Sequence, residues 1–227
     1  MKQSYLRKAL AFTGLATQTL TQGLALVGLL ALVILIVGPR FDADSGAVSD
    51  AQADAIAEVD GLEQSLYAEV DSAIESQQRT LAAYLARRYR VAGDALDQLV
   101  RDAYQVGHQW KIDPLLILSV VAIESSFNPI AESGYGAKGL MQVVPRFHLD
   151  KLDAHGGHEA LLDPSINIQV GAQILKTYIR QTGSLESGLQ MYGGATSDPE
   201  SRYARKVMAE QARLRRVLSA NTNSTKI

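Results

Sequence analysis

One carboxylate of this sequence stands in an unusual setting for a charged side chain. Glu124 comes at the end of the apolar run LLILSVVAIE, directly after Ile123. Burial penalises the charged form of a carboxyl group, so its pKa rises and its proton is retained near neutral pH. A protonated carboxyl can act as a general acid, for example toward a glycosidic oxygen. The run alone leaves open a helix-end glutamate that turns to solvent or caps a neighbouring loop.

A glycine-rich loop follows, SGYGAKGLMQ, at residues 133–142. Glycine is favoured where the backbone turns tightly or approaches a ligand closely. Gly134, Gly136 and Gly139 formally satisfy G-x-G-x-x-G, but that motif binds dinucleotides only when a strand precedes it in a βαβ unit. Here a helical pattern and Asn128-Pro129 come before it. We therefore reject a nucleotide site.

The combined run ESSFNPIAESGYGAKGLMQVVP resembles bacterial lytic transglycosylases with a lysozyme-like (soluble lytic transglycosylase, SLT) domain. The resemblance covers roughly Ala95 to Leu218. Several separated motifs match in order, and this order is more specific than any single motif. The later matches are Asn167-Ile168 with Gly171, the Tyr192 segment, and Tyr203 with Val207.

The resemblance implies cleavage of the β-1,4 bond between N-acetylmuramic acid and N-acetylglucosamine in peptidoglycan, leaving a 1,6-anhydro end. Glu124 would protonate the glycosidic oxygen and then, as a carboxylate, accept the proton of the C6 hydroxyl. The substrate's own acetamido group would stabilise the positive charge, so no second carboxylate is required, unlike in most glycosidases. Glu132 is close in sequence, but we interpret it as a solvated loop acid.

The resemblance further implies substrate contacts from Ser133, Met141, Gln142, Tyr192 and Tyr203. Each has a simpler alternative. Ser133 could form a turn, Gln142 could brace a loop, and Met141 could pack in the core. The two tyrosines could be core residues with only their hydroxyls at the surface.

The sequence departs from the family pattern at one place. The family usually shows Ala-Tyr-Asn-x-Gly, whereas this chain reads Met191-Tyr192-Gly193-Gly194-Ala195. Gly193 stands where the asparagine is expected, so any substrate contact of that side chain is missing. This departure leaves the geometry of that wall of the site open.

Composition narrows the function classes. The chain has 227 residues, a formal net charge of −2 and a pI near 6.1, which argues against a nucleic-acid partner. It has no cysteine, which excludes disulfides, thiolate metal sites and cysteine nucleophiles. His155 and His158 lie near Asp153 and Asp163, but their spacing matches no helical metal motif such as H-E-x-x-H. We predict no metal and no cofactor.

The N-terminal segment has the pattern of a membrane anchor. No charged residue occurs from Ala9 to Pro39, and Gly23 to Gly38 is almost wholly aliphatic, which approaches the roughly 20 residues needed to span a bilayer. Lysine and arginine precede it, and acidic residues dominate the stretch after Arg40. The positive-inside rule then places the remainder outside the cytoplasm. A cleaved signal peptide and a buried core helix are the alternatives, but Gly38-Pro39-Arg40-Phe41 offers no convincing cleavage site.

Helical periodicity dominates the rest of the chain. From Asp50 to about Arg90 apolar residues recur on one face, and Gly61 weakens or splits this helix. This face could pack on its own domain or form a stalk or coiled-coil contact. Further helices are predicted at about 95–110, from Asp113-Pro114 to Phe127-Asn128-Pro129, from Asp163-Pro164 to Ile179, and at 185–192 and 201–218. The helix after Asp113 is apolar all round, which predicts a buried central helix.

The sequence thus predicts a mainly α protein with a lysozyme-like domain, an N-terminal transmembrane helix and a helical stalk. It would be a single-pass protein of the cytoplasmic (inner) membrane with its catalytic domain in the periplasm. Its partners would be peptidoglycan glycan strands, the membrane and an envelope-spanning machine. A hydrolytic muramidase and a catalytically quiet wall-binding subunit are the alternatives. The predicted segments are a cytoplasmic N-terminus (1–19), an anchor (20–38), a linker (39–49), a stalk (50–93), the transglycosylase domain (94–218) and a flexible tail (219–227).

Overall fold

The computed structural model describes residues 47–224 of the chain. The chain divides into two compact units, residues 1–66 and 67–227, and the second contains all features of the site described below. The predicted anchor at 20–38 lies outside the described residues. Within residues 47–224, none of the helices combines the length and apolar character that crossing a membrane requires.

The predicted stalk is helical. Helix α3 runs from Ala47 to Tyr89 without a break at Gly61. A glycine inside a helix costs only about 1 kcal/mol relative to alanine, and the neighbouring alanine, glutamate and glutamine residues are good helix formers. The helix begins before the predicted start, so residues 47–49 of the predicted linker are helical.

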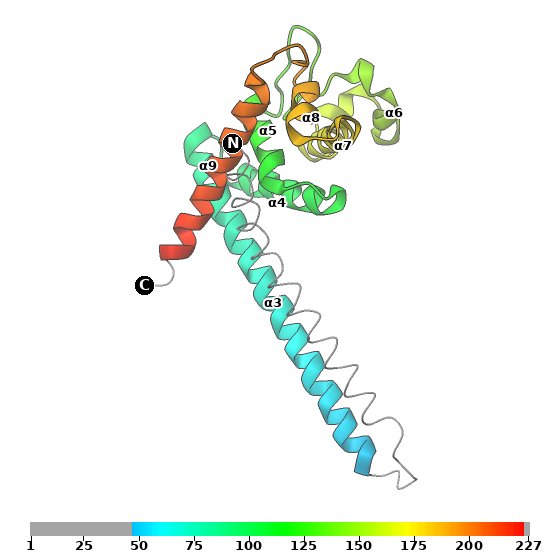
Figure 1. Ribbon diagram of the computed structural model, residues 1–227, viewed down its shortest axis with the longest axis vertical. Helices are drawn as coiled ribbons and strands as arrows, with labels where there is room; N and C mark the ends of the chain where they lie inside the picture. Colours follow the sequence, from blue (N-terminus) through cyan, green and yellow to red (C-terminus); the bar gives the residue numbers. More distant parts are fainter. Residues whose placement is uncertain (1–46, 225–227) are drawn as a thin grey trace, which may run out of the picture. The chain divides into compact units, whose positions relative to one another are not determined.

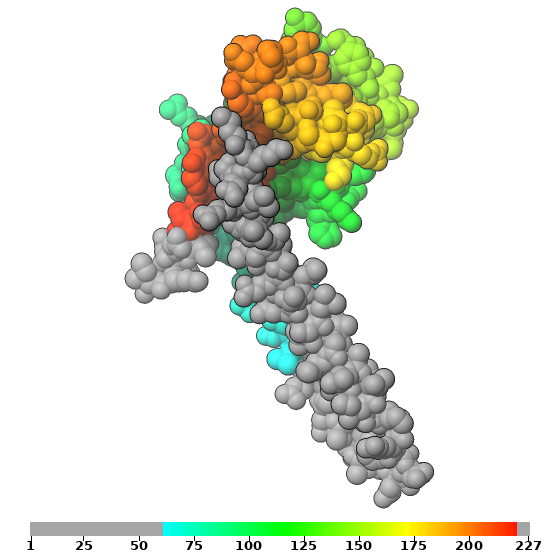
Figure 2. All heavy atoms as spheres, viewed as in Figure 1, coloured from blue at the N-terminus to red at the C-terminus, as the bar shows by residue number. Residues whose placement is uncertain are grey.

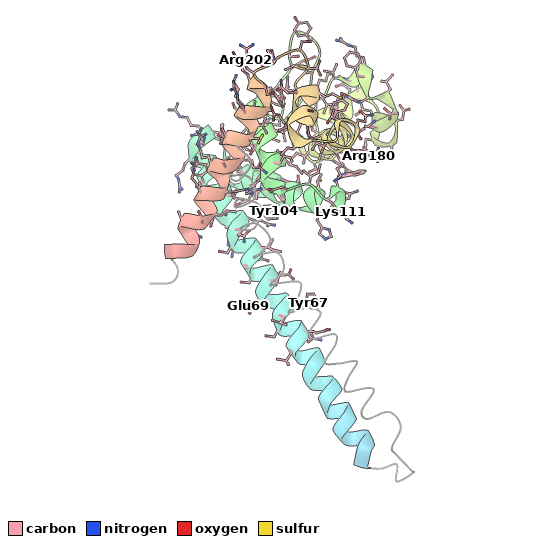
Figure 3. All side chains as sticks on the ribbon, viewed as in Figure 1. Tyr67, Glu69, Tyr104, Lys111, Arg180 and Arg202 are labelled. Atoms are coloured by element: carbon pink, nitrogen blue, oxygen red, sulfur yellow. The ribbon has the colours of Figure 1, made fainter. Side chains whose placement is uncertain are left out.

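The two parts of the apolar face of α3 have different environments. In the second unit, Tyr67 and Val70 are exposed, and Tyr67 and Glu69 project from the helix (Figure 3). Further along, Leu81 and Leu85 are completely buried in the core of the same unit. The last turns of α3 therefore pack on their own domain, which was one of the two interpretations of this face.

The second unit is built from helices, and no strand occurs among the described residues (Figure 1). Two isolated bridges join Lys138 to Glu132 and to Val143. Helix α9 extends to Ser224, so residues 219–224 of the predicted tail are helical. After α3, the helices are α4 (Gly93–Trp110), α5 (Pro114–Glu124), α6 (Leu149–Leu152), α7 (Pro164–Thr182), α8 (Leu185–Tyr192) and α9 (Arg202–Ser224), with short 3-10 turns η1 (Pro145–Phe147), η2 (Asp153–His155) and η3 (His158–Leu162).

Helix α5 is the buried central helix that the sequence predicts. The Asp113 carboxylate caps it by accepting a hydrogen bond from the Leu115 amide at 2.8 Å, and Pro114 fits the first turn. Every residue from Leu115 to Ala122 is buried, and α5 packs against α4 and α9. Helix α7 contacts α4 and α8, and α8 contacts α9.

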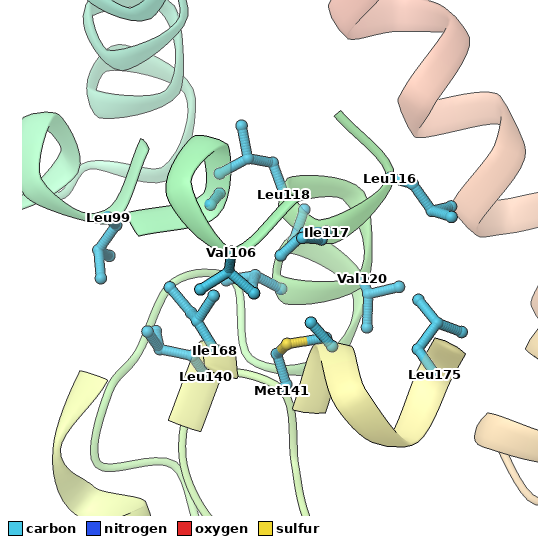
Figure 4. Packing of buried hydrophobic residues seen from close by; sticks show 14 of the residues in the cluster. Leu99, Val106, Leu116, Ile117, Leu118, Val120, Leu140, Met141, Ile168 and Leu175 are labelled. Atoms are coloured by element: carbon cyan, nitrogen blue, oxygen red, sulfur yellow. The ribbon is translucent and has the colours of Figure 1, made fainter. Parts of the chain in front are cut away.

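The hydrophobic core gathers side chains from all of these helices and from the loop between α5 and η1 (Figure 4). It includes Ile117 and Val120 of α5, Leu175 of α7, and Leu140 and Met141 of the loop. In the space-filling view, α7 and α8 (yellow to orange) lie beside the yellow-green segment at 145–162 (Figure 2). Loop residues thus take part in the core, which fixes the loop against the helices.

Helix α5 ends three residues earlier than predicted. Ser126 and Phe127 both adopt left-handed backbone conformations, with φ of 51° and 65°. Such conformations are costly for residues with a side chain and persist where surrounding contacts stabilise them. Phe127 is buried, and its ring centroid lies 4.9 Å from that of Tyr89 in α3. This contact holds the turn directly after Glu124.

Candidate active site

An open cleft of about 660 Å³ lies at the end of α5. Its walls come from the C-terminal end of α5, the loop after it, η1, the end of α8 and the start of α9. Among the described residues that line it, Glu124 is the one carboxylate. The lining residues are Ile123, Glu124, Ser133, Tyr135, Ala137, Gln142, Val144, Arg146, Phe147, Tyr192, Gly193, Gly194 and Tyr203.

Glu124 is the last residue of α5 and faces this cleft while it is itself partly buried. Burial raises the pKa of its carboxyl group above the ordinary value of 4.5. The Tyr203 hydroxyl donates a hydrogen bond to Glu124 Oε1 at 2.5 Å, which acts in the opposite sense and lowers that pKa. Burial is the larger effect, so the carboxyl retains its proton more readily than a solvated glutamate.

Tyr192 and Tyr203 line the cleft together with the acid. Burial raises the pKa of both Tyr192 and Tyr203, and the neighbouring charge of Glu124 raises it further. Both hydroxyls therefore stay protonated and act as donors. Tyr203 donates to Glu124, and Tyr192 donates to the Met141 carbonyl at 2.8 Å. Tyr192 thus ties α8 to the loop, and Tyr203 ties α9 to the acid.

Ser133 and Gln142 both line the cleft and also brace their loop. Ser133 Oγ accepts a hydrogen bond from the Ala137 amide at 3.1 Å, which closes a turn. Gln142 Nε2 donates to the carbonyls of Ala131 and Gly139, at 3.1 and 3.0 Å. The backbone of Gln142 is left-handed, with φ of 48°. The bracing roles that were the alternatives for these side chains are present in the structure.

Met141 does not line the cleft, so its predicted substrate contact is wrong for the side chain. Its exposure is 0%, and it packs in the core against α7. A Cβ atom at Gly171 would lie 2.5 Å from Met141 Sδ, which shows how closely the thioether approaches that helix. Only the Met141 carbonyl takes part in the site, as the acceptor for Tyr192.

Asn167 of α7 fixes the glycine-rich loop through three hydrogen bonds. Its side chain is completely buried, and its Oδ1 accepts a hydrogen bond from the Met141 amide at 2.7 Å. Its Nδ2 donates to the carbonyls of Lys138 and Leu161 at 2.9 and 2.8 Å. Gly139 is left-handed, with φ of 75°, and a Cβ there would lie 2.1 Å from Asn167 Nδ2. Glycine is therefore required at position 139, both because the backbone is left-handed and because a side chain would overlap Asn167.

Sequence reasoning missed the aromatic residues at the rim of the cleft. Tyr135 and Phe147 are exposed by 82% and 65%, and both line the cleft. Arg146 Nη1 donates to the Tyr135 carbonyl at 3.2 Å, and its guanidinium carbon lies 4.7 Å from the centroid of the Phe147 ring. The available signal was an aromatic residue between two glycines, Tyr135 in Gly-Tyr-Gly.

A smaller cavity of about 280 Å³ adjoins the cleft. The two share Gln142, Val144, Phe147, Tyr192 and Gly194. His148 and Tyr178 line the smaller cavity only, and burial lowers the pKa of the His148 imidazole. In residues 47–224, no three His, Asp or Glu side chains gather in a way that would hold a metal ion. His155 and His158 lie in the separate turns η2 and η3.

The family model for the transglycosylase SLT domain matches residues 102–210, which include α5, the glycine-rich loop and both tyrosines. The match confirms the resemblance to the SLT domain family that the sequence motifs indicate for this part of the chain.

Relatives with curated names agree with this assignment. A transglycosylase of Enterobacteria phage PRD1 is 37% identical over 89 residues, covering 39% of this chain and 32% of that protein. Membrane-bound lytic murein transglycosylase C of Mannheimia succiniciproducens is 42% identical over 77 residues, covering 31% and 22%. The protein of the same name from Glaesserella parasuis is 36% identical over 106 residues, covering 44% and 27%. The chain spans less than a third of the length of these relatives.

Two solved structures align with part of the chain. The lytic transglycosylase Slt of Pseudomonas aeruginosa aligns with a TM-score of 0.48 and 18% identity, over 53% of this chain and 24% of that one. The 70 kDa soluble lytic transglycosylase of Escherichia coli aligns with a TM-score of 0.47 and 21% identity, over 62% and 30%.

Proposed function

We propose that this protein is a peptidoglycan lytic transglycosylase with a lysozyme-like catalytic domain and that Glu124 is its general acid and then its general base. One observation carries this proposal. A carboxyl group with a raised pKa, hydrogen-bonded by Tyr203, faces an open cleft in an SLT domain, and no other described residue lining that cleft is a carboxylate.

The hydrogen bond from Tyr203 orients the acid. Because Oε1 accepts that bond, the proton of the neutral carboxyl resides on Oε2. In the first step this proton passes to the glycosidic oxygen, the bond to the anomeric carbon breaks, and the leaving sugar departs as an alcohol. Glu124 is then a carboxylate and can serve as the base.

In the second step, the Glu124 carboxylate acts as the general base. The C6 hydroxyl of the N-acetylmuramic acid attacks its own anomeric carbon while its proton returns to Glu124. A 1,6-anhydro sugar forms, and the enzyme regains its starting protonation state. The substrate's acetamido group stabilises the intermediate positive charge, which removes the need for the second carboxylate that most glycosidases use.

The remaining cleft residues would bind the glycan. Ser133 and Gln142 offer polar atoms from the loop, and Tyr192 and Tyr203 line the cleft from α8 and α9. The exposed rings of Tyr135 and Phe147 give the rim large apolar faces on which sugar rings can lie. The adjoining cavity extends the groove past Tyr192, as a polymeric substrate requires.

We further propose that residues 20–38 anchor the protein in the inner membrane, with the catalytic domain in the periplasm. The uncharged apolar segment and the positive-inside rule support this topology. Relatives named membrane-bound lytic murein transglycosylase C support a location at a membrane. An envelope-spanning machine remains a proposed partner.

The test uses the full-length chain in detergent, incubated with purified sacculi beside a Glu124→Gln variant. Glu132→Gln is the matched control, because that carboxylate is exposed and lies outside the cleft residues. Mass spectrometry separates anhydro ends from hydrolysed ends, which carry one more water. We expect anhydro products from the wild type and from Glu132→Gln, and none from Glu124→Gln.

Two other results would replace the proposal. Reducing ends in place of anhydro ends would make the protein a muramidase. A folded wild-type protein that pellets with sacculi but releases nothing would make it a wall-binding subunit.

A further inference from the structure

Gly193 sits against the ring of Tyr203. A Cβ atom at position 193 would lie 2.5 Å from Tyr203 Cγ and 2.6 and 2.8 Å from the two Cδ atoms. Such distances are far below van der Waals contact, so an added side chain and the ring cannot occupy these positions together. The three atoms form the base of the ring, which cannot move aside as the tip of a flexible side chain can.

The backbone at position 193 does not itself require glycine. Its φ and ψ are −77° and 5°, which any residue can adopt. The space taken by the Tyr203 ring is therefore the constraint at this position. By contrast, Gly194 has a left-handed φ of 64° and no atom near its added Cβ. The two neighbouring glycines serve different purposes.

The Tyr203 ring is held at both ends. At its tip, the hydroxyl donates to Glu124 Oε1 at 2.5 Å. At its base, the first turn of α9 is fixed because the Ala204 amide donates to Gln190 Oε1 at 3.0 Å and the Arg202 amide donates to Asp198 Oδ2 at 3.0 Å. The ring has no alternative position that keeps both ends in place.

The backbone of Gly193 is equally restricted. Its amide donates to the Leu189 carbonyl at 2.9 Å at the end of α8, and the next amide donates to the Met191 carbonyl at 3.2 Å. The preceding residue, Tyr192, is tied to the Met141 carbonyl. Neither the Gly193 backbone nor the Tyr203 ring can move away from the other without breaking hydrogen bonds.

We infer that Gly193 is a positioning residue for the reaction: its lack of a side chain seats the Tyr203 ring so that the hydroxyl reaches Glu124. This inference rests on the proposed function and deepens it. In this structure, a side chain at position 193 would begin in the space that the Tyr203 ring fills. Glycine at 193 and the observed Tyr203 conformation depend on each other.

The consequence is measurable as a change in the pH profile. The first step needs protonated Glu124, so activity falls as pH rises through the pKa of that group. The hydrogen bond from Tyr203 lowers this pKa. A side chain at 193 that displaces the ring removes the bond, so the alkaline limb of the profile moves to higher pH while kcat falls.

The experiment compares Gly193→Ala, Gly193→Asn, Tyr203→Phe and the double variant Gly193→Ala/Tyr203→Phe in the full-length chain. Gly93→Ala is the matched control, since an added Cβ there meets no atom within 4 Å. We expect each Gly193 variant to lower kcat about tenfold, the size of the effect of losing one ordinary hydrogen bond. The alkaline limb should move upward as in Tyr203→Phe, and the double variant should be no slower than Tyr203→Phe alone.

Three results would overturn the inference. One is a folded Gly193→Ala variant with an unchanged pH profile. Another is a double variant whose losses in kcat multiply. The third concerns folding: if Gly193→Ala unfolds, adding Tyr203→Ala should restore the melting temperature by removing the ring, and no restoration would show that the clash lies elsewhere.

A titration independent of turnover separates this inference from the proposed function. The ¹³C-labelled carboxyl of Glu124 is followed by NMR in the wild type and in Gly193→Ala. A higher pKa in the variant supports the positioning role even if sacculi yield no product. An unchanged pKa contradicts it even if Glu124 proves essential for activity.

Discussion

The three hydrogen bonds of the Asn167 side chain predict a large loss of stability when that side chain is removed. In Asn167→Ala, the buried Met141 amide and the Leu161 carbonyl both lose the bonds described above, at 2.7 and 2.8 Å. The Lys138 carbonyl is less affected, because it still accepts a hydrogen bond from the Val143 amide at 3.1 Å. Two buried backbone groups are therefore left without the partner that the side chain supplied.

These groups set the expected magnitude. Leaving a buried donor or acceptor unsatisfied costs about 1–3 kcal/mol each, and the third bond adds about 1 kcal/mol. Alanine favours the helix over asparagine by at most about 0.7 kcal/mol, which offsets part of the loss. We expect the free energy of unfolding to fall by about 3–5 kcal/mol, a large share of the 5–15 kcal/mol typical of a domain.

Urea denaturation followed by circular dichroism measures this change. With a denaturant dependence of about 2 kcal/mol per molar, the midpoint should fall by roughly 1.5–2.5 M. Asn128→Ala is the matched control, since that exposed side chain accepts a single hydrogen bond, from the Ile130 amide at 3.2 Å. It should change the free energy of unfolding by less than about 1 kcal/mol.

A loss below about 1 kcal/mol for Asn167→Ala, with an unchanged denaturant dependence, would refute the reasoning. Such a result would mean that water replaces the amide and that the loop does not depend on it. The buried position of Asn167 argues against this replacement.

Three further predictions follow from the site and its supports. Glu124→Gln should stabilise the fold at alkaline pH and lose this advantage below pH 4.5. In the wild type, the folded state keeps a proton that the unfolded chain releases above pH 4.5, so the free energy of unfolding falls as the pH rises from 4.5 toward the raised pKa of Glu124. Thermal melts at several pH values test this. Tyr192→Phe should lower the free energy of unfolding by about 1 kcal/mol through loss of its bond to Met141, and urea titration measures it; no change would show that bond to be dispensable. Gly171→Ala should lower the free energy of unfolding by about 1–3 kcal/mol, since the added methyl overlaps Met141 Sδ. Met141→Ala in the same chain should recover the part of the loss that comes from that overlap. Strictly additive effects of the two substitutions would contradict the overlap.

The sequence predicted the helices of the second unit well because their ends carry local signals. Asp113 and Asp163 each precede a proline and cap a helix, and both caps are present in the structure. The apolar run before Glu124 predicted the buried central helix. The resemblance implies substrate contacts from Tyr192 and Tyr203; the structure places both in the lining of the cleft with Glu124, and the contacts themselves stay a prediction.

The loop between α5 and η1 could not be predicted in the same way. Whether Met141 points into the core or into the cleft depends on Gly171, thirty residues away in sequence. The left-handed turn at Ser126 and Phe127 depends on the ring of Tyr89, and Gln142 braces carbonyls that only the folded loop brings near. Side-chain direction in such loops is set by distant partners, which single-sequence patterns do not reveal.

The contact between Tyr89 and Phe127 bears on where the structural support of the candidate active site begins along the chain. The family match starts at residue 102, yet Tyr89 supports the turn after the acid, and its hydroxyl donates to the buried Glu210 carboxylate of α9 at 3.1 Å. Arg88 also pairs with Glu210, at 3.5 Å. A fragment cut at the edge of the matched region would lose these supports while keeping every residue that lines the cleft. The smallest fragment that keeps the candidate site intact must therefore retain the last turns of α3, and strain applied to those turns would reach the turn after Glu124 through the Tyr89–Phe127 contact.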